Sequence, residues 1–203
     1  MWYDCSEYMI SKGGKELEAS CSLVNRMVRA ARLDSNLYEE VEADTAANKQ
    51  ALLAVIVVSL LSGIGSGIGG LATRGGLWFI WGLLMGLVSS IVGWLAWSFV
   101  TYLIGTRLFK TAQTSATWGE LLRTIGFSNS PGALRFFSFV PYLGGLIALG
   151  ASVWSLIAGV IAVRQALDFS TGRAIATCIV GWVIYMVIVF LVTILFLGTG
   201  AIY

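Results

Sequence analysis

Long uncharged runs are the feature that most constrains this sequence. Residues 51–71, 77–105 and 174–197 contain no charged side chain, and the first two runs extend over about 21 and about 29 positions. A helix needs about 20 consecutive apolar residues to cross the hydrocarbon core of a bilayer. Charged residues make up only 12% of the chain, against roughly 25% in soluble domains. The sequence therefore predicts an all-α, polytopic membrane helix bundle.

A fourth apolar stretch, residues 126–164, is too long for one crossing and short for two. A continuous helix from Pro131 to Val163 would extend about 50 Å, against a hydrocarbon core of about 30 Å. One interpretation is a single, strongly tilted helix, which gives four crossings in total. The other is a tight hairpin broken at a proline, which gives five. The residues expected to shape the break are Pro131, Pro141, Gly144 and Gly145, since proline removes a backbone donor and glycine loosens a helix.

The distribution of basic residues favours the hairpin. Cytoplasmic loops collect Lys and Arg near the ends of the spans. Basic residues lie in the N-terminal segment, in residues 106–127 and in residues 164–173, whereas the loop after the first run has only Arg74. All three basic segments lie on one side only if residues 131–163 cross the membrane an even number of times. We then expect a cytoplasmic N-terminus, with Arg135 near the cytoplasmic face where its head reaches water or phosphate.

Residues 22–33 have the pattern of an amphipathic basic helix. Apolar residues share one face, and arginines recur at intervals of three on another. Such a helix lies in the headgroup plane with its arginines toward anionic lipid. An ordinary helix packed on the surface of the membrane domain is the alternative. The lipid-interface candidates of this helix are Arg26, Arg29 and Arg32.

Residues 106–127 are the most polar stretch after the N-terminal region. Thr117 and Glu120 have the spacing of a capped helix start, which predicts a second interfacial helix that ends at Gly126. The lipid-interface candidates here are Arg107, Lys110 and Trp118.

Composition divides the chain into three parts. Residues 1–21 are polar, have no signal-peptide pattern and are expected to form a poorly ordered extension. Residues 22–50 contain the basic helix and an acidic run at 34–44, which is interpreted as a solvated linker or as a partner surface. Residues 51–203 form the membrane domain.

Glycine spacing predicts close helix packing. Residues 65–70 match the dinucleotide fingerprint G-x-G-x-x-G, but they lie inside an apolar run and not between a strand and a helix. Pairs of glycines four residues apart let a neighbouring helix approach closely. The candidate packing residues are Gly63, Gly67, Gly82 and Gly86.

Several functional classes have no support in the composition. The chain has no histidine, which removes the serine–histidine triad and most zinc sites. Cys5, Cys21 and Cys178 lack metal-binding spacing. The net charge of +2 does not suggest a nucleic-acid partner. We expect no enzyme activity, no metal and no cofactor.

Motifs in the second half of the chain resemble the Yip domain family of multi-pass membrane proteins. The motifs are WGELLRTIGFS at 118–128, Pro131, Pro141, WSL at 154–156, VRQAL at 163–167 and STGRA at 170–174. The resemblance extends from about residue 25 to the C-terminus, and residues 26–41 are similar to the prokaryotic branch. It implies five membrane helices, a cytoplasmic N-terminus and, for a prokaryotic member, the plasma membrane. Eukaryotic members act in vesicle trafficking and bind prenylated Rab-type GTPases, partly through a DLYGP-like motif. Here NLYE at 36–39 lacks the following Gly-Pro, so GTPase binding is not carried over.

Two functions follow as expectations. The first is a non-enzymatic membrane-organising scaffold that binds anionic headgroups through its basic interfacial helices and binds a protein partner or a second copy through its helix faces. The second is a small-molecule or ion transporter or channel. Transport usually leaves ionisable side chains inside the spans, where Arg135 is the only candidate.

Overall fold

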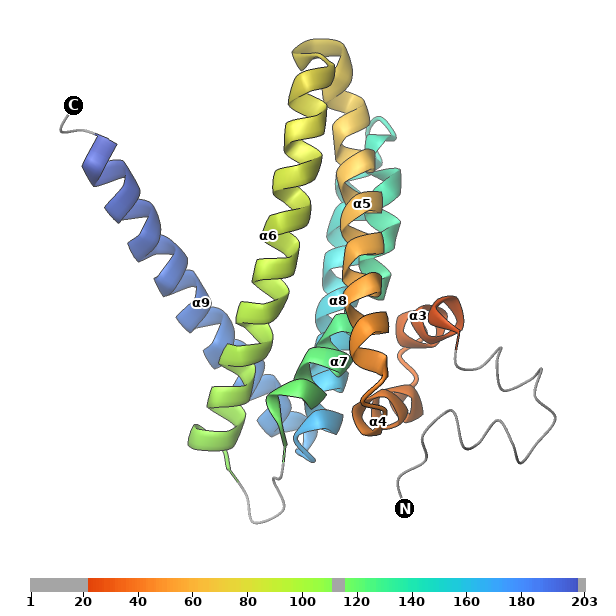
Figure 1. The fold of residues 1–203 in the computed structure, drawn as a ribbon, viewed down its shortest axis with the longest axis vertical. Coiled ribbons are helices and arrows are strands. Elements are labelled where there is room, and N and C mark those ends of the chain that lie inside the picture. Colours follow the sequence, from red (N-terminus) through yellow and green to blue (C-terminus); the bar gives the residue numbers. More distant parts are fainter. Residues whose placement is uncertain (1–21, 111–115, 201–203) are drawn as a thin grey trace.

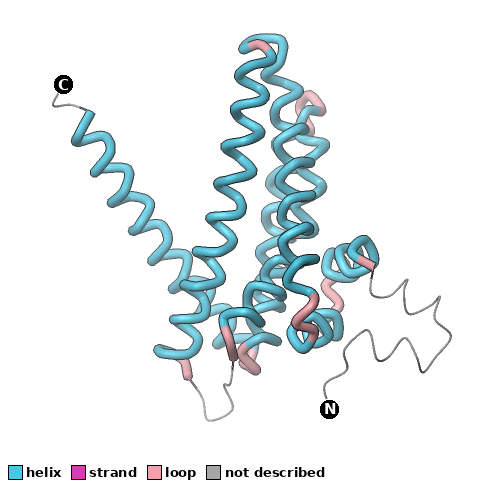
Figure 2. Tube along the Cα trace, viewed as in Figure 1, coloured by secondary structure: helices cyan, strands magenta, loops and turns pink. Residues whose placement is uncertain are grey.

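The structure is a computed structural model, and it describes residues 22–110 and 116–200. Within these residues there are helices and loops and no strand (Figures 1 and 2). The elements are α3 (Leu23–Ala31), α4 (Ser35–Ala43), α5 (Ala47–Arg74), α6 (Gly76–Leu103), a π-helical turn η1 (Ile104–Leu108), α7 (Trp118–Ser128), a 3₁₀ helix η2 (Ser130–Phe139), α8 (Gly144–Ala166) and α9 (Thr171–Gly200). The expected all-α class is confirmed.

Among the residues that the structure describes, three helices are long and apolar enough to cross a membrane. They comprise Ala47–Ile68, the combined α6–η1 segment Gly76–Leu108, and Gly144–Ala166. A shorter apolar helix covers Thr171–Val187. The 22 residues of Ala47–Ile68 extend about 33 Å, which matches the hydrocarbon core.

Glycines set the approach of α6 to α5. Gly75, with φ of 78°, forms the turn between the two antiparallel helices. A Cβ on Gly63 would lie 2.8 Å from Leu83 Cδ1, and a Cβ on Gly67 would overlap the Phe79 ring. Gly63 and Gly67 therefore pack as expected. Gly82 and Gly86 do not, because no atom lies within 4 Å of a Cβ placed on either.

The stretch from Pro131 onward forms a hairpin, so the single tilted helix is excluded. The chain reverses after Val140, where Tyr142 has φ of 64° and the Gly144 N–H donates to Val140 O at 2.8 Å (Figure 1). Gly144 is required at the bend, since a Cβ there would overlap the carbonyl of Ser138. Pro131 plays a different part from the one expected, because it begins the 3₁₀ helix instead of breaking it.

The first arm of the hairpin is shorter than a spanning α-helix. The ten residues of η2 extend about 20 Å at the 3₁₀ rise. The arm packs between α5 and α8 and approaches α5 through Gly65, where a Cβ would lie 2.6 Å from Arg135 O. The first arm therefore does not add a spanning α-helix to the three found among the described residues.

Helices α3 and α4 pack at one end of the bundle, beside α7 and the C-terminal end of α8 (Figure 1). Of the two interpretations of the acidic run, the solvated linker is wrong: residues 35–43 form α4, with the Asp34 side chain as its N-cap. Leu37, Tyr38 and Val41 are fully buried because their i, i+1, i+4 spacing places them on one helical face. We call α3 and α4 together the cap.

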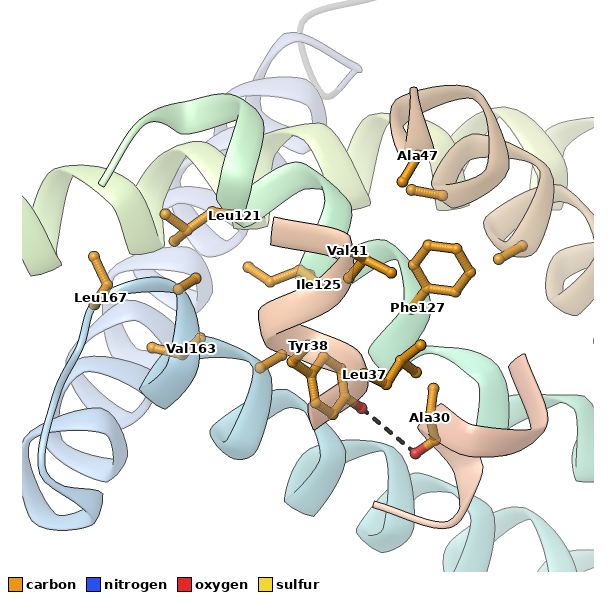
Figure 3. Close-up of a cluster of buried hydrophobic side chains, with 14 of the residues drawn as sticks. Ala30, Leu37, Tyr38, Val41, Ala47, Leu121, Ile125, Phe127, Val163 and Leu167 are labelled. Carbon is orange, nitrogen blue, oxygen red and sulfur yellow. Dashed lines mark hydrogen bonds between the residues drawn. The ribbon is translucent and has the colours of Figure 1, made fainter. Parts of the chain in front are cut away.

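The cap shares a hydrophobic core with the bundle. Figure 3 shows Leu37, Tyr38 and Val41 among side chains from α7 and α8. The Tyr38 hydroxyl donates to Ala30 O at 3.5 Å and thereby joins α4 to α3. Residues 22–50 therefore pack with the membrane helices as one unit.

Candidate functional site

Arg26 is the centre of an ion-pair cluster inside the cap. Its side chain is 1% exposed. Nη2 donates to Glu40 Oε1 at 3.0 Å and to Asp44 Oδ2 at 2.9 Å, and Nη1 donates to Gln50 Oε1 at 2.9 Å. The assignment of Arg26 to a lipid surface is therefore corrected: it joins α3 to α4 and to the first turn of α5.

Arg29 and Arg32 differ from Arg26 in exposure. Arg29, 26% exposed, donates to Asp34 Oδ2 at 2.9 Å and to Glu40 Oε2 at 2.6 Å. Burial opposes ionisation of Asp34, but the hydrogen bond from Arg29 prevails and lowers the pKa of Asp34. Arg32 is exposed, as are Val28 and Val24, the latter at 70%. Only Arg32 keeps its whole head available to a membrane surface.

Arg123 of α7 is a second buried arginine that fastens the cap. Its Nε donates to Val41 O at 2.9 Å, and its Nη2 donates to Glu42 O. These are carbonyls of the last turn of α4, where a cation is favourable. Sequence reasoning used Arg123 only as a loop charge. The signal that could have found it is an arginine beside Leu121, Thr124 and Ile125 on the buried side of a short helix.

Glu42 lies half-buried near Arg123. Burial, helped by the nearby carboxylates of Glu120 and Asp168, raises the pKa of Glu42 to about 7 against the opposing effect of Arg123. This carboxyl therefore changes its charge near neutral pH.

The remaining interface candidates lie at the same end of the molecule. Arg107 and Lys110 are exposed and line a hollow of about 520 Å³ with Tyr102, Thr106 and Ala116. Trp118 is 5.7 Å from Phe99 in an edge-to-face contact. The predicted helix start is confirmed: Thr117 and Glu120 form a capping box, and α7 continues to Ser128, two residues beyond the predicted end. That these side chains contact lipid stays a prediction.

A large cavity lies between α5, α6, η2, α8 and α9. Its volume is about 1040 Å³, and its lining includes Gly82 and Gly86 together with Cys178. Arg135 is the only charged side chain among the described residues that line it. Its Nη2 donates to Ser152 Oγ at 3.0 Å.

The Arg135 carbonyl meets α5 at Gly65, sixteen residues or about 24 Å along the helix from Lys49. Its side chain contacts Ser152, and Trp154, two residues further along α8, donates through Nε1 to Ala31 O of α3 at 2.8 Å. That Arg135 reaches the cap-side headgroups therefore stays a prediction.

The described residues contain no group of three or more His, Cys, Asp or Glu side chains that could hold a metal ion. The cap cluster offers guanidinium groups and carboxylates that pair with one another, and the cavity offers one guanidinium group and hydroxyls, which suits anion binding.

Comparison with known proteins gives one result. A family model described as the Yip1 domain matches residues 35–196, which begins at α4 and leaves α3 outside the match. No curated protein and no solved structure matches the chain. The match covers most of the chain and includes every apolar helix described above, so this integral membrane protein belongs to the Yip1 domain family.

Proposed function

We propose that this protein is a non-enzymatic, membrane-organising scaffold of the prokaryotic branch of the family, resident in the plasma membrane. Its cap binds the cytoplasmic leaflet and presents a fixed surface to a protein partner or to a second copy. The observation that carries the proposal is the cap itself, which Arg26 and Arg123 fasten to the bundle end while Val24, Val28 and Arg32 remain exposed. An exposed apolar pair beside a cation is the composition of an interfacial helix.

The proposal includes five crossings with the cap inside. The cap, the α8–α9 turn, the C-terminal end of α6 and the N-terminal end of α7 lie at one end of the molecule, whereas the α5–α6 turn and the η2–α8 bend lie at the other (Figure 1). Gln165 Nε2, at the end of α8, donates to Glu39 Oε1 of the cap at 2.7 Å. Because the basic segments share the cap end, the positive-inside rule supports a cytoplasmic cap. The third crossing would be the short η2 arm, shielded from lipid in part by α5 and α8.

Cysteine accessibility tests this topology. In a chain with Cys5, Cys21 and Cys178 replaced by serine, single cysteines are introduced as Tyr142→Cys at the exposed hairpin tip and Asp168→Cys at the α8–α9 turn. A membrane-impermeant thiol reagent applied to intact cells should label the first and not the second. Labelling of both from the same side would contradict the five-crossing arrangement.

Lipid contact by the cap is tested by quenching. Val28 is replaced by cysteine in the same background and labelled with an environment-sensitive fluorophore, and the protein is reconstituted into vesicles with brominated anionic lipid. We expect stronger quenching than for a label at Glu39, which is exposed on α4. Equal quenching at the two positions would contradict membrane insertion of α3. A partner is then sought by crosslinking in native membranes.

A second candidate function is transport, which the cavity and its single arginine favour. It predicts flux of a small anion across liposomes that contain the protein and a lower flux with Arg135→Ala. The scaffold proposal predicts no flux from either protein.

A further inference from the structure

The cavity between α5, α6, η2, α8 and α9 has a polar and an apolar part. Its polar part gathers around Arg135 of η2 and two serines of α8, Ser152 and Ser155. Its apolar part includes Leu156 of α8 and Ile179 and Trp182 of α9. The volume of about 1040 Å³ is at the upper end of the range for ligand sites.

The polar part has hydrogen-bond capacity that the chain does not use. A guanidinium has five N–H donors, and the described residues give Arg135 one acceptor, Ser152 Oγ. Ser152 in turn donates to Ala148 O at 2.7 Å, which fixes its hydroxyl. Ser155 is among the lining residues, but its Oγ is buried and has no hydrogen-bond partner among the described residues. The donors of Arg135 therefore lie at a cavity whose described lining holds no carboxylate.

An anion is the chemical complement of this region. A planar guanidinium with neighbouring hydroxyls matches the geometry of phosphate oxygens, which accept two parallel N–H bonds. Within an apolar bundle an uncompensated cation is unfavourable, so an anionic group beside Arg135 would remove a cost that the protein otherwise carries.

The apolar part of the cavity favours a lipid over a free anion as the ligand. Leu156 is 64% exposed and Ile179 57% exposed, although both line the cavity. The cavity is therefore open along its side, and α9 diverges from α6 toward its C-terminal end (Figure 1). In a bilayer, an opening on the side of the bundle faces acyl chains.

We propose that this cavity is a binding site for an anionic phospholipid, with the phosphate held by Arg135 beside Ser152 and an acyl chain lying against Ile179 and Trp182. The lipid fills the space between α6 and α9 and joins the two helices through its chain. This site is separate from the cap, and it does not depend on the scaffold proposal.

The test is native mass spectrometry of the full-length protein in mild detergent. Dioleoylphosphatidic acid is titrated against the wild type, Arg135→Gln and the control Lys49→Gln, whose lysine is exposed in the first turn of α5. We expect apparent affinity to fall at least about tenfold in Arg135→Gln, as charge-assisted hydrogen bonds are lost, and to stay unchanged in Lys49→Gln. Equal affinity in all three proteins would overturn the proposal.

Two further measurements separate the sources of the anion and guard against misfolding. Inorganic phosphate should not displace the lipid, and dioleoylphosphatidylcholine should bind more weakly. Displacement by phosphate at equal concentration, or equal binding of the zwitterionic lipid, would overturn the assignment to an anionic lipid.

Gly86→Leu places a side chain into the cavity from α6, where space is open, and leaves Arg135 intact. It should also weaken lipid binding; unaltered binding by a folded Gly86→Leu protein would refute the location.

Discussion

Replacing Arg26 by methionine should release the cap from the bundle. The substitution keeps most of the side-chain volume and removes the hydrogen bonds to Glu40, Asp44 and Gln50. Asp44, whose side chain is only 8% exposed, then lacks its cation. The loss therefore combines a broken ion pair with a buried carboxylate that has no counter-charge.

The magnitude follows from burial. Removing one partner of a buried ion pair costs about 3 to 5 kcal/mol. Glu40 is 32% exposed and recovers part of its hydration, so the lower end of that range applies. About 3 kcal/mol corresponds to roughly a 150-fold change in an equilibrium constant. Arg29 provides the contrast, since its pairs are partly exposed and typically contribute about 0.2 to 1 kcal/mol.

Hydrogen exchange in nanodiscs measures this opening directly. In Arg26→Met, amides of α4 should exchange on the order of 100-fold faster than in the wild type, whereas amides in the middle of α5 should keep their protection. Arg29→Met should accelerate exchange in α4 only a few-fold, and Arg32→Met should leave it unchanged. If the α4 amides of Arg26→Met exchanged at the wild-type rate, the inference that the buried cluster holds the cap would be refuted.

The other predictions concern pH, packing and the second buried arginine. The pKa of Glu42 in the folded protein, about 7, is raised above its usual 4.5, so the stability that Glu42 contributes to cap docking is complete below pH 4.5 and is lost as pH rises through 7. The protection of α4 amides against hydrogen exchange, corrected for intrinsic exchange rates, should therefore fall from pH 6 to 8. Glu42→Gln should abolish this pH dependence. Gly65→Ala should lower the melting temperature in detergent, since its Cβ would lie 2.6 Å from Arg135 O, whereas Gly86→Ala, with open space, should not lower it. Arg123→Met leaves Val41 O and Glu42 O without their donor and should also make α4 accessible to protease. Arg107→Met, at an exposed arginine, is the control. Equal cleavage of the two variants would contradict the role of Arg123.

Element lengths and one turn could be predicted because each depends on local sequence. An uncharged run longer than a bilayer needs no partner to be recognised, and Val140 to Gly145 combines a proline with two glycines at a bend. The capping box at Thr117 and Glu120 is likewise contained within four residues. In each case the physical cause lies inside the segment itself.

The cap could not be predicted in full, because its determinants are tertiary. The acidic residues at 34–44 were weighed by their charge, although Leu37, Tyr38 and Val41 already had helical spacing. The partners of Arg26 lie 14 to 24 positions further along the chain, and nothing local distinguishes Arg26 from Arg32. Which of three similar arginines is buried depends on how α3 packs against α4.

Three arginines differ in what neutralises them, and that difference assigns them to different roles. Arg26 meets two carboxylates and Arg123 meets carbonyls at the end of α4, so each is satisfied by the chain and serves docking of the cap. Arg135 is partly exposed and meets one serine hydroxyl in the described residues. A structural role for Arg135 would need a second acceptor, because one neutral hydroxyl offsets little of the cost of a cation within a membrane. The missing acceptor therefore points to a ligand from outside the chain, and in a bilayer the most abundant anion at hand is a lipid phosphate.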